Sequence, residues 1–141
     1  MKKRLFILED DPNAMPIVDW LKGKHNLEVI HARTLEDAVY HLEYCDDSLV
    51  ESYDYFLFDA SIPGATVPSV TNEIINFHAE DGLNGILLFD RYRNRIMESN
   101  AKVAFMTAFS SQIKNREEIF DMHTIDKTSE NFIKDLSEFL A

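Results

Sequence analysis

The sequence is poor in cysteine and in basic side chains, and it has no long uninterrupted apolar run. Its one cysteine, Cys45, cannot form a disulfide within the chain, and no Cys-x-x-Cys pair or Cys/His cluster is present that would predict a zinc site. No repeat or low-complexity segment is present either. A reducing cytoplasm is therefore the expected location.

The shortage of basic residues argues against two classes of partner. There are 14 lysines and arginines against 25 aspartates and glutamates, which gives a formal net charge of −11. A field of this sign repels phosphate backbones and anionic lipid. Direct binding to nucleic acid or to a membrane is therefore disfavoured.

No segment approaches membrane-spanning length. The start, Met1-Lys2-Lys3-Arg4, is basic like a signal peptide, but only four apolar residues follow before Glu9. We expect a soluble chain that stays inside the cell. With 141 residues and 45% hydrophobic content, it fits a single compact domain, residues 1–141, with a substantial core.

Five apolar runs predict β-strands, and helical patterns separate them. The predicted strands are Arg4–Leu8, Leu27–His31, Tyr53–Phe58, Lys102–Met106 and His123–Ile125. The predicted helices run from Asp11-Pro12 to near Gly23, from Thr34 to Cys45, from Gly85 to about Ser99, from about Ser111 to Phe120, and from Ser129 to Leu140. This alternation favours an α/β fold, a parallel sheet covered by helices on both faces.

One stretch, about residues 65–84, interrupts the alternation. Ser69 is a candidate N-cap, Val70, Ile74 and Phe77 recur at helical spacing, and Gly82 is a candidate helix end. The spacing predicts an extra helix that packs over the rim of a site or forms a surface for a partner.

Polar side chains stand where four of the predicted strands end, and sites in open parallel sheets lie at such ends. They are Glu9, Asp10 and Asp11 after the first strand, Asp59 after the third, Thr107 after the fourth and Lys127 after the fifth. Four of them also have an ordinary explanation, whereas capping leaves Glu9 and Asp10 unexplained. Asp11 is best explained as an N-cap, Asp59 as a turn former before Pro63-Gly64, Thr107 as a strand residue or cap, and Lys127 as an exposed loop lysine.

Together, these side chains predict a chemistry that none of them predicts alone. An acidic pair can hold Mg²⁺ through oxygens, and Mg²⁺ usually binds one or two carboxylates plus phosphate oxygens. A nucleophilic carboxylate, a hydroxyl and an ammonium complete the groups needed to position a phosphoryl group and neutralise its charge. Phosphoryl transfer to Asp59 is therefore a plausible reaction.

The chain resembles the receiver domains of response regulators, the CheY-like family, over nearly its whole length. Three segments and one residue carry the resemblance: Leu5 to Asp11 with the acidic pair Glu9-Asp10, Phe56 to Gly64 with Asp59, Val103 to Ala108 with Thr107, and Lys127. The resemblance implies a flavodoxin-like, doubly wound, five-stranded parallel sheet of order 2-1-3-4-5, with the extra helix inserted between strand 3 and helix 3.

The resemblance also implies roles for these residues. Asp59 would accept the phosphoryl group. Asp10, Asp59 and the backbone carbonyl of Ser61 would hold Mg²⁺, with Glu9 acting mostly through water, and Thr107 and Lys127 would contact the phosphoryl oxygens. A histidine kinase, a phosphotransfer protein or a small phosphodonor would supply the group. A downstream protein target would receive the signal, and a homodimer is a further option.

The chain departs from the family pattern in three places. Gly85, which matches the glycine that opens helix 3, follows Asp59 by 26 positions, far more than usual, so an insert separates them. Thr124 stands where the family usually has an aromatic residue, and Thr128 where a proline commonly follows the lysine. Because the stretch from Thr107 to Lys127 is also slightly short, we expect trimmed elements there.

Leu140-Ala141 follows the last predicted helix directly, so we expect a stand-alone receiver that signals by protein contact. The main alternative is a pseudo-receiver, an interaction module of the same fold that is not phosphorylated. A less favoured one is a Mg²⁺-dependent phosphatase or phosphotransferase with Asp59 as nucleophile and the insert as a substrate cap. A flavin-binding protein is weaker still, because no Ser/Thr/Gly-rich phosphate loop follows the first strand.

Overall fold

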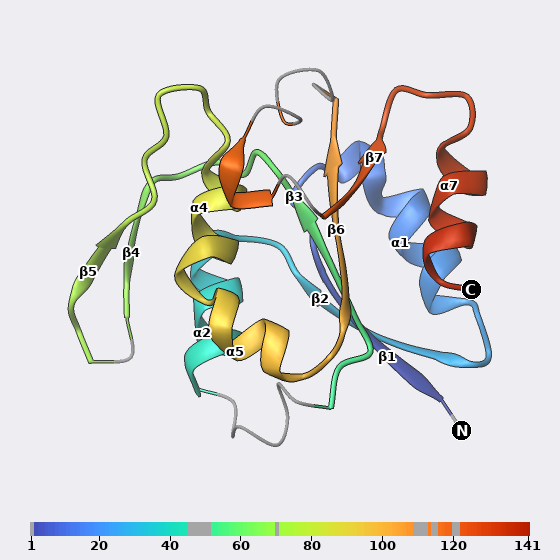
Figure 1. Cartoon of the computed structure of the whole chain (residues 1–141), viewed down its shortest axis with the longest axis horizontal. Helices are drawn as coiled ribbons and strands as arrows, with labels where there is room; N and C mark the ends of the chain where they lie inside the picture. Colours follow the sequence, from blue (N-terminus) through green and yellow to red (C-terminus); the bar gives the residue numbers. More distant parts are fainter. Residues whose placement is uncertain (1, 45–51, 70, 109–112, 114–115, 120–121) are drawn as a thin grey trace.

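The computed structural model describes residues 2–44, 52–69, 71–108, 113, 116–119 and 122–141. Its main sheet has five parallel strands: β1 (Lys3–Leu8), β2 (Leu27–Ala32), β3 (Tyr55–Asp59), β6 (Lys102–Thr107) and β7 (His123–Asp126). Their spatial order is β2-β1-β3-β6-β7, which is the predicted order 2-1-3-4-5 (Figure 1). The predicted flavodoxin-like sheet is thereby confirmed.

Helices cover both faces of the sheet, which explains why the strands are apolar at nearly every position. Side chains alternate between the faces along each strand. On β1, Leu5 and Ile7 belong to one hydrophobic cluster and Phe6 and Leu8 to the other, and all four are fully buried.

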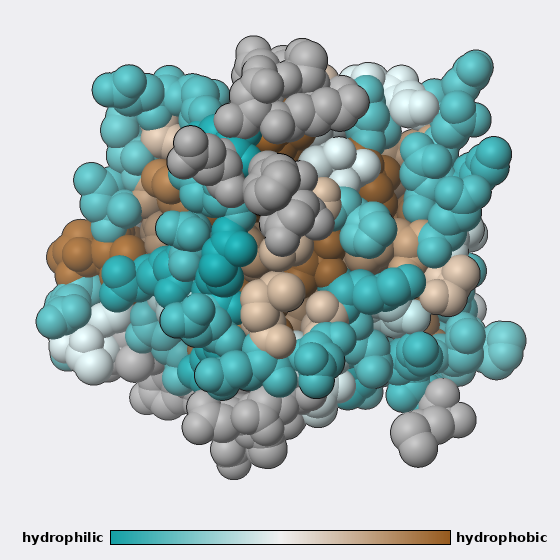
Figure 2. Space-filling view, viewed as in Figure 1, coloured by the Kyte–Doolittle hydropathy of each residue, from teal (hydrophilic) through white to brown (hydrophobic). Residues whose placement is uncertain are grey.

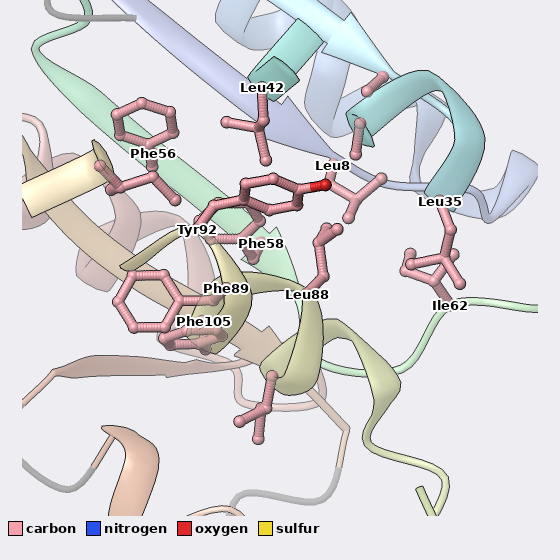
Figure 3. Close-up of a cluster of buried hydrophobic side chains, with 14 of the residues drawn as sticks. Leu8, Leu35, Leu42, Phe56, Phe58, Ile62, Leu88, Phe89, Tyr92 and Phe105 are labelled. Atoms are coloured by element: carbon pink, nitrogen blue, oxygen red, sulfur yellow. The ribbon is translucent and has the colours of Figure 1, made fainter. Parts of the chain in front are cut away.

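The two faces have different helices and different cores. The helices α1 (Met15–Lys22) and α7 (Phe132–Phe139) cover the face of Leu5 and Ile7, while α2 (Leu35–Tyr44), α4 (Asn84–Arg91) and α5 (Arg93–Glu98) cover the other (Figure 1). The second face is rich in aromatic rings. Phe58 packs on Phe56, Phe89 and Phe105, with ring centroids 5.8 to 5.9 Å apart (Figure 3).

The structure confirms the predicted caps of the first two helices but not that of the last helix. Asp11 caps a short 3-10 turn, η1 (Pro12–Ala14), by accepting the Asn13 N–H at 2.9 Å, and Thr34 Oγ1 accepts the Asp37 N–H at 3.0 Å before α2. Ser129, however, closes a turn ahead of α7, which begins at Phe132.

Two helix predictions need correction in detail. The helix expected from Gly85 to Ser99 is two helices, because the backbone leaves helical values at Tyr92 (φ −106°, ψ 15°) between α4 and α5. Ile133, expected to face inward on the last helix, is 43% exposed.

The insert is present, but the predicted extra helix is wrong. The described residues of the insert form an antiparallel hairpin of β4 (Thr66–Pro68) and β5 (Ile74–Asn76), and β4 lies beside α2 (Figure 1). Ile75 and Phe77 are buried, whereas Ile74 is 69% exposed. Burial thus follows the period of two that belongs to a strand, and the helical spacing of Ile74 and Phe77 was misleading.

Some predicted features fall on residues that are not described. Val70 and Cys45 are among them, as is half of the helix expected from Ser111 to Phe120. In that stretch Ile113 is buried, and a 3-10 turn, η2 (Glu117–Ile119), precedes β7. Among the described residues, no helix has the length and apolar character needed to cross a membrane.

Candidate functional site

The polar residues at the strand ends meet at one edge of the sheet, the upper edge in Figure 1. Parallel strands bring their carboxyl ends to the same edge. Backbone hydrogen bonds also join the residues that directly follow the strands. Ala60 N–H donates to the Met106 carbonyl at 3.0 Å, and Lys127 N–H donates to the Thr107 carbonyl at 2.9 Å. These bonds hold the segments after β3, β6 and β7 close together.

Lys127 lies between two buried carboxylates. Its Nζ is 2.7 Å from Asp59 Oδ2 and 2.6 Å from Glu9 Oε2. Asp59 is 6% exposed and Glu9 is 1% exposed. The contact with Asp59 is a charge-assisted hydrogen bond, which is among the strong ones in proteins, and the contact with Glu9 is an ion pair. Lys127 therefore ties the end of β7 to the ends of β1 and β3.

Glu9 is held by backbone as well as by Lys127. Its Oε1 accepts the Asp11 N–H at 3.1 Å, and its backbone carbonyl lies 2.8 Å from His31 Nε2. The Glu9 N–H donates to the Ala32 carbonyl at 3.0 Å, which continues the β1–β2 ladder. A buried carboxylate needs such partners, because burial without them is costly.

The cluster holds more negative than positive charge. The pKa of Asp59 is raised to about 7, chiefly by burial and further by the nearby Glu9 carboxylate, while attraction and hydrogen bonding to Lys127 oppose the rise. Burial also raises the pKa of Asp10. Burial alone would lower the pKa of Lys127, but attraction to Asp59 and hydrogen bonds to Asp59 and Glu9 outweigh it and raise that pKa. A further positive charge would relieve this imbalance.

The donor set fits a hard divalent cation. Carboxylate oxygens of Glu9, Asp10 and Asp59 lie within 4.8 Å of one another. All three are oxygen donors with an excess of negative charge, which is what Mg²⁺ selects, and Mg²⁺ keeps several waters in addition to one or two carboxylates. The residues present therefore fit the predicted ion.

An open cavity lies over Asp59. Its lining residues include Asp10, Asp59, Ser61, Thr107 and Lys127. Ser61 is exposed and its N–H donates to Asp59 Oδ1 at 3.0 Å, while Thr107 is 2% exposed at the end of β6. The structure thus brings together every residue predicted from the strand ends, with Glu9 behind Lys127.

The hairpin does not cover this cavity. None of the described residues in the stretch 64–83 is among those that line it, and the buried side chains of the hairpin pack into the cluster that contains α2 (Figure 1). The expectation that the insert packs over the rim of the site is therefore wrong. The apolar part of the cavity lining comes from Ile62, Pro63 and Ala108 instead, together with Pro12.

Sequence reasoning missed Asn84, which organises the loop after Asp59. Its Oδ1 accepts the Ile62 N–H at 2.8 Å, and its Nδ2 donates to the Ile62 and Gly64 carbonyls at 2.5 and 2.6 Å. Asn84 is buried, so a single side chain satisfies three backbone groups away from water. The only signal for it in the sequence is its place beside Gly85.

Gly85 contacts the acceptor strand itself. Its N–H donates to the Ala60 carbonyl at 2.9 Å, and a Cβ at this position would lie 2.0 Å from the Asp59 backbone oxygen. Only glycine lets α4 approach the end of β3 so closely. The two ends of the insert are therefore anchored beside Asp59.

The two unusual threonines have ordinary surroundings. Thr124 is half-buried on β7. Thr128 donates both its N–H and its hydroxyl to Asp126 Oδ1, at 2.8 and 2.7 Å. A proline in place of Thr128 would lack the N–H, so this turn before α7 uses a bond that the usual family residue cannot make.

No protein-family model matches the chain, and no curated protein sequence matches it. Solved structures do match over its length. The response regulator TrrA from Thermotoga maritima in complex with Mg²⁺-BeF has a TM-score of 0.62 at 19% identity, covering 99% of both chains. A CheY-like receiver domain from Methylobacillus flagellatus has a TM-score of 0.65 at 16% identity, covering 99% of this chain and 97% of the other.

A third match comes from a structure of the histidine kinase ThkA in complex with TrrA. The matching chain has a TM-score of 0.60 at 18% identity, and 99% of each chain is covered. These likenesses show that the chain has the response regulator receiver fold, as the sequence motifs predict.

Proposed function

We propose that this chain is a receiver of two-component signalling, which accepts a phosphoryl group on Asp59 in a Mg²⁺-dependent reaction and then acts through protein contacts. One observation carries the proposal. Asp59 faces an open cavity, 2.7 Å from Lys127, with the carboxylates of Glu9 and Asp10 beside it. A nucleophile, an acidic cluster and an ammonium are the groups that phosphoryl transfer to a carboxylate needs.

The acidic cluster is the proposed Mg²⁺ site. Asp10, Asp59 and the backbone carbonyl of Ser61 would bind the ion, and Glu9 would act mostly through water. Bound there, Mg²⁺ would neutralise charge on a phosphoryl oxygen and on the carboxylates. The excess negative charge and the raised pKa of Asp59 support this assignment.

Asp59 is the proposed nucleophile. Its ionised carboxylate would form a bond to phosphorus while the bond from phosphorus to the donor's nitrogen or oxygen breaks, giving an acyl phosphate. Because Asp59 has a pKa of about 7 without a cation, the reactive form is more populated above that pH.

Lys127 and Thr107 are proposed to hold the phosphoryl oxygens. Lys127 already lies at hydrogen-bonding distance from the acceptor carboxylate, and Thr107 lines the same cavity. Hydrolysis by water would return Asp59 to its free form. Since these contacts exist only with the phosphoryl group present, they would bias the segments after β6 and β7 toward a second conformation.

A histidine kinase is the proposed donor, and a phosphotransfer protein or a small phosphodonor would supply the same chemistry. The structurally similar TrrA is found in complex with the histidine kinase ThkA, which supports a kinase as the partner. The open cavity over Asp59 leaves room for a donor to approach.

Incubation with acetyl phosphate and Mg²⁺, followed by intact mass measurement, tests the proposal. We expect the mass of one phosphoryl group to be added to the wild-type chain and to Asp90→Asn, which changes an exposed aspartate on α4. Asp59→Asn should gain nothing, and neither should the wild type in EDTA. A gain that survives in Asp59→Asn would exclude Asp59 as the acceptor.

A pseudo-receiver is the second candidate, and Thr124 favours it. The half-buried position on β7 lacks the aromatic side chain that the family usually uses to report phosphorylation. This function predicts no mass gain from acetyl phosphate or from any kinase, with Mg²⁺ binding retained. The same mass experiment therefore separates the two functions.

A further inference from the structure

The β4–β5 hairpin has an open outer edge. The two strands form a sheet of their own, and β4 lies beside α2, so β5 is the outer strand (Figure 1). β5 has no further strand beside it among the described residues. Open edges of this kind are templates for pairing with another chain, and proteins usually protect them.

The free backbone groups of this edge follow from the pairing pattern. In antiparallel pairs, hydrogen-bonded positions alternate with positions whose N–H and C=O groups point away from the partner strand. Ser69 N–H donates to the Glu73 carbonyl at 2.7 Å, so that pair is a bonded one. The backbone N–H and C=O groups of Ile74 and Asn76 therefore point away from β4, toward the outer edge of the hairpin.

The other edge of the hairpin cannot serve in the same way. Pro68, which lies opposite Ile74 on β4, has no N–H to donate, and this strand contacts α2. β5 is therefore the edge to which a further strand can be added.

The outer face of the hairpin is apolar at its centre. Ile74 is 69% exposed, and its cross-strand neighbour Pro68 is exposed as well. A brown area in Figure 2 marks the left rim of the molecule, where Figure 1 draws β5. Buried Ile75 and Val67 hold the other face of the hairpin against the core, so the exposed face is kept in place.

The surroundings of the edge are acidic. Residues 64–83 include Glu73, Glu80 and Asp81 and contain no lysine or arginine. Asp81 pairs with Arg116 at 2.5 Å, while Glu73 and Glu80 are exposed next to the hairpin strands. A ligand of this edge should therefore carry positive charge.

We propose that the outer edge of β5 binds an extended, basic segment of a partner protein, which adds to the hairpin as a third strand. Its backbone would pair with Ile74 and Asn76, an apolar side chain would cover Ile74 and Pro68, and flanking lysines or arginines would face Glu73 and Glu80. This is the strand-addition mode of peptide recognition. A second copy of this chain is disfavoured as the occupant, since each copy has a formal charge of −11. The binding does not depend on phosphorylation of Asp59.

Selection of random linear peptides on the immobilised protein, in Mg²⁺-free buffer, tests this inference. We expect enriched peptides to alternate apolar residues with lysine or arginine. On titration into ¹⁵N-labelled protein, the largest amide shifts should fall on Ile74, Asn76 and their neighbours. Ile74→Arg should weaken binding by about tenfold or more. Met97→Arg is the matched control, because Met97 is also an exposed apolar residue, 40% exposed on α5; it should bind like the wild type.

Each outcome decides the matter. Loss of affinity in Ile74→Arg alone, with an unchanged melting temperature, supports the edge as the site. Equal loss in Ile74→Arg and Met97→Arg would mean a general charge effect and overturn it, as would failure to enrich any peptide or shifts that fall elsewhere. Asp59→Asn should bind these peptides unchanged, so failure of the phosphoryl-transfer proposal is detected separately.

Discussion

The acidic cluster and the β4–β5 hairpin are built in opposite ways. The cluster joins Glu9, Asp59 and Lys127 from three distant parts of the chain, and all three side chains are largely buried and paired with one another. The hairpin is a local structure in which β4 and β5 pair with each other, with one apolar face buried and the other exposed. The cluster therefore depends on the whole sheet. The hairpin depends on the pairing of its two strands and on the packing of its buried face against the core.

This difference separates the consequences of mutation in the two regions. In the cluster, a change to one group alters the balance of buried charge around the others, so stability and chemistry change together. In the hairpin, the two faces can be changed independently, and the site should not be affected. Four substitutions, in order of decreasing effect, test this contrast.

Lys127→Ala should have the largest effect. It leaves the buried carboxylates of Glu9 and Asp59 without their counter-charge, and removal of one partner of a buried pair costs about 3 kcal/mol of unfolding free energy. The loss should be smaller at pH 5, where Asp59 can take up a proton. Urea unfolding at pH 8 and pH 5 measures both values. Lys134→Ala, at an exposed position on α7, is the control, and an equal loss there would contradict the prediction.

Gly85→Ala should cost roughly 2 to 3 kcal/mol. The new Cβ would lie 2.0 Å from the Asp59 backbone oxygen, so α4 or the end of β3 has to move. Phosphorylation by acetyl phosphate should slow as well. Gly23→Ala is the matched control, because its Cβ would meet its nearest atom at 3.4 Å and its φ is −74°. Equal unfolding midpoints for the two variants would show that the contact is not tight.

Asp59→Asn should change the pH dependence of stability. The folded-state pKa of Asp59 is raised from 3.8 to about 7, so its contribution is fully present below pH 4 and is lost as the pH rises through about 7. The variant lacks this loss, and Lys127 stays paired with Glu9 in it, so it should be more stable than the wild type at pH 8 by about 2 kcal/mol. Urea midpoints at pH 5 and pH 8, in EDTA, measure it.

The control for this comparison is Asp90→Asn, which makes the same chemical change at an exposed position. Its stability should follow the wild type at both pH values. Added Mg²⁺ should stabilise the wild type at pH 8 and leave Asp59→Asn unchanged, because a ligand stabilises only the state that binds it. If the wild type grew more stable between pH 5 and pH 8 in EDTA, the assigned direction would be wrong.

The smallest expected effect distinguishes the two faces of the hairpin. Ile75→Val removes one buried methylene and should cost about 1 kcal/mol, whereas Ile74→Val, the same change on the adjacent exposed residue, should be within about 0.5 kcal/mol of the wild type. Both variants should be phosphorylated at the wild-type rate. Equal costs would mean that the hairpin does not bury Ile75, and a slowed reaction would mean that it communicates with Asp59.

The sheet was predictable because its signal lies in the strands themselves. Runs such as Leu5 to Leu8 are apolar on both faces, and their order along the chain, with helices between them, leaves few topologies. The position of the candidate site followed from the same pattern, since parallel strands must end at one edge. The contacts made by Asn84 could not be predicted, because they join its side chain to backbone groups about twenty positions earlier in the chain.

The hairpin shows where periodicity fails. Ile74, Ile75 and Phe77 satisfy both a helical and a strand spacing over so short a stretch, and only contact with the α2 face shows which of them are buried. Asn72, at φ 66°, adopts a left-handed conformation in the turn between the strands.

The amino-acid sequence by itself determined the strands, their polar ends and hence the receiver fold, because apolar periodicity and strand-terminal residues are properties of short segments. Only the tertiary structure decided that Lys127 bridges Glu9 and Asp59, that glycine is required at position 85, and that the insert is a hairpin with a free edge. Those features depend on distances between segments far apart in the chain, and such distances exist only once the sheet and its helices have packed.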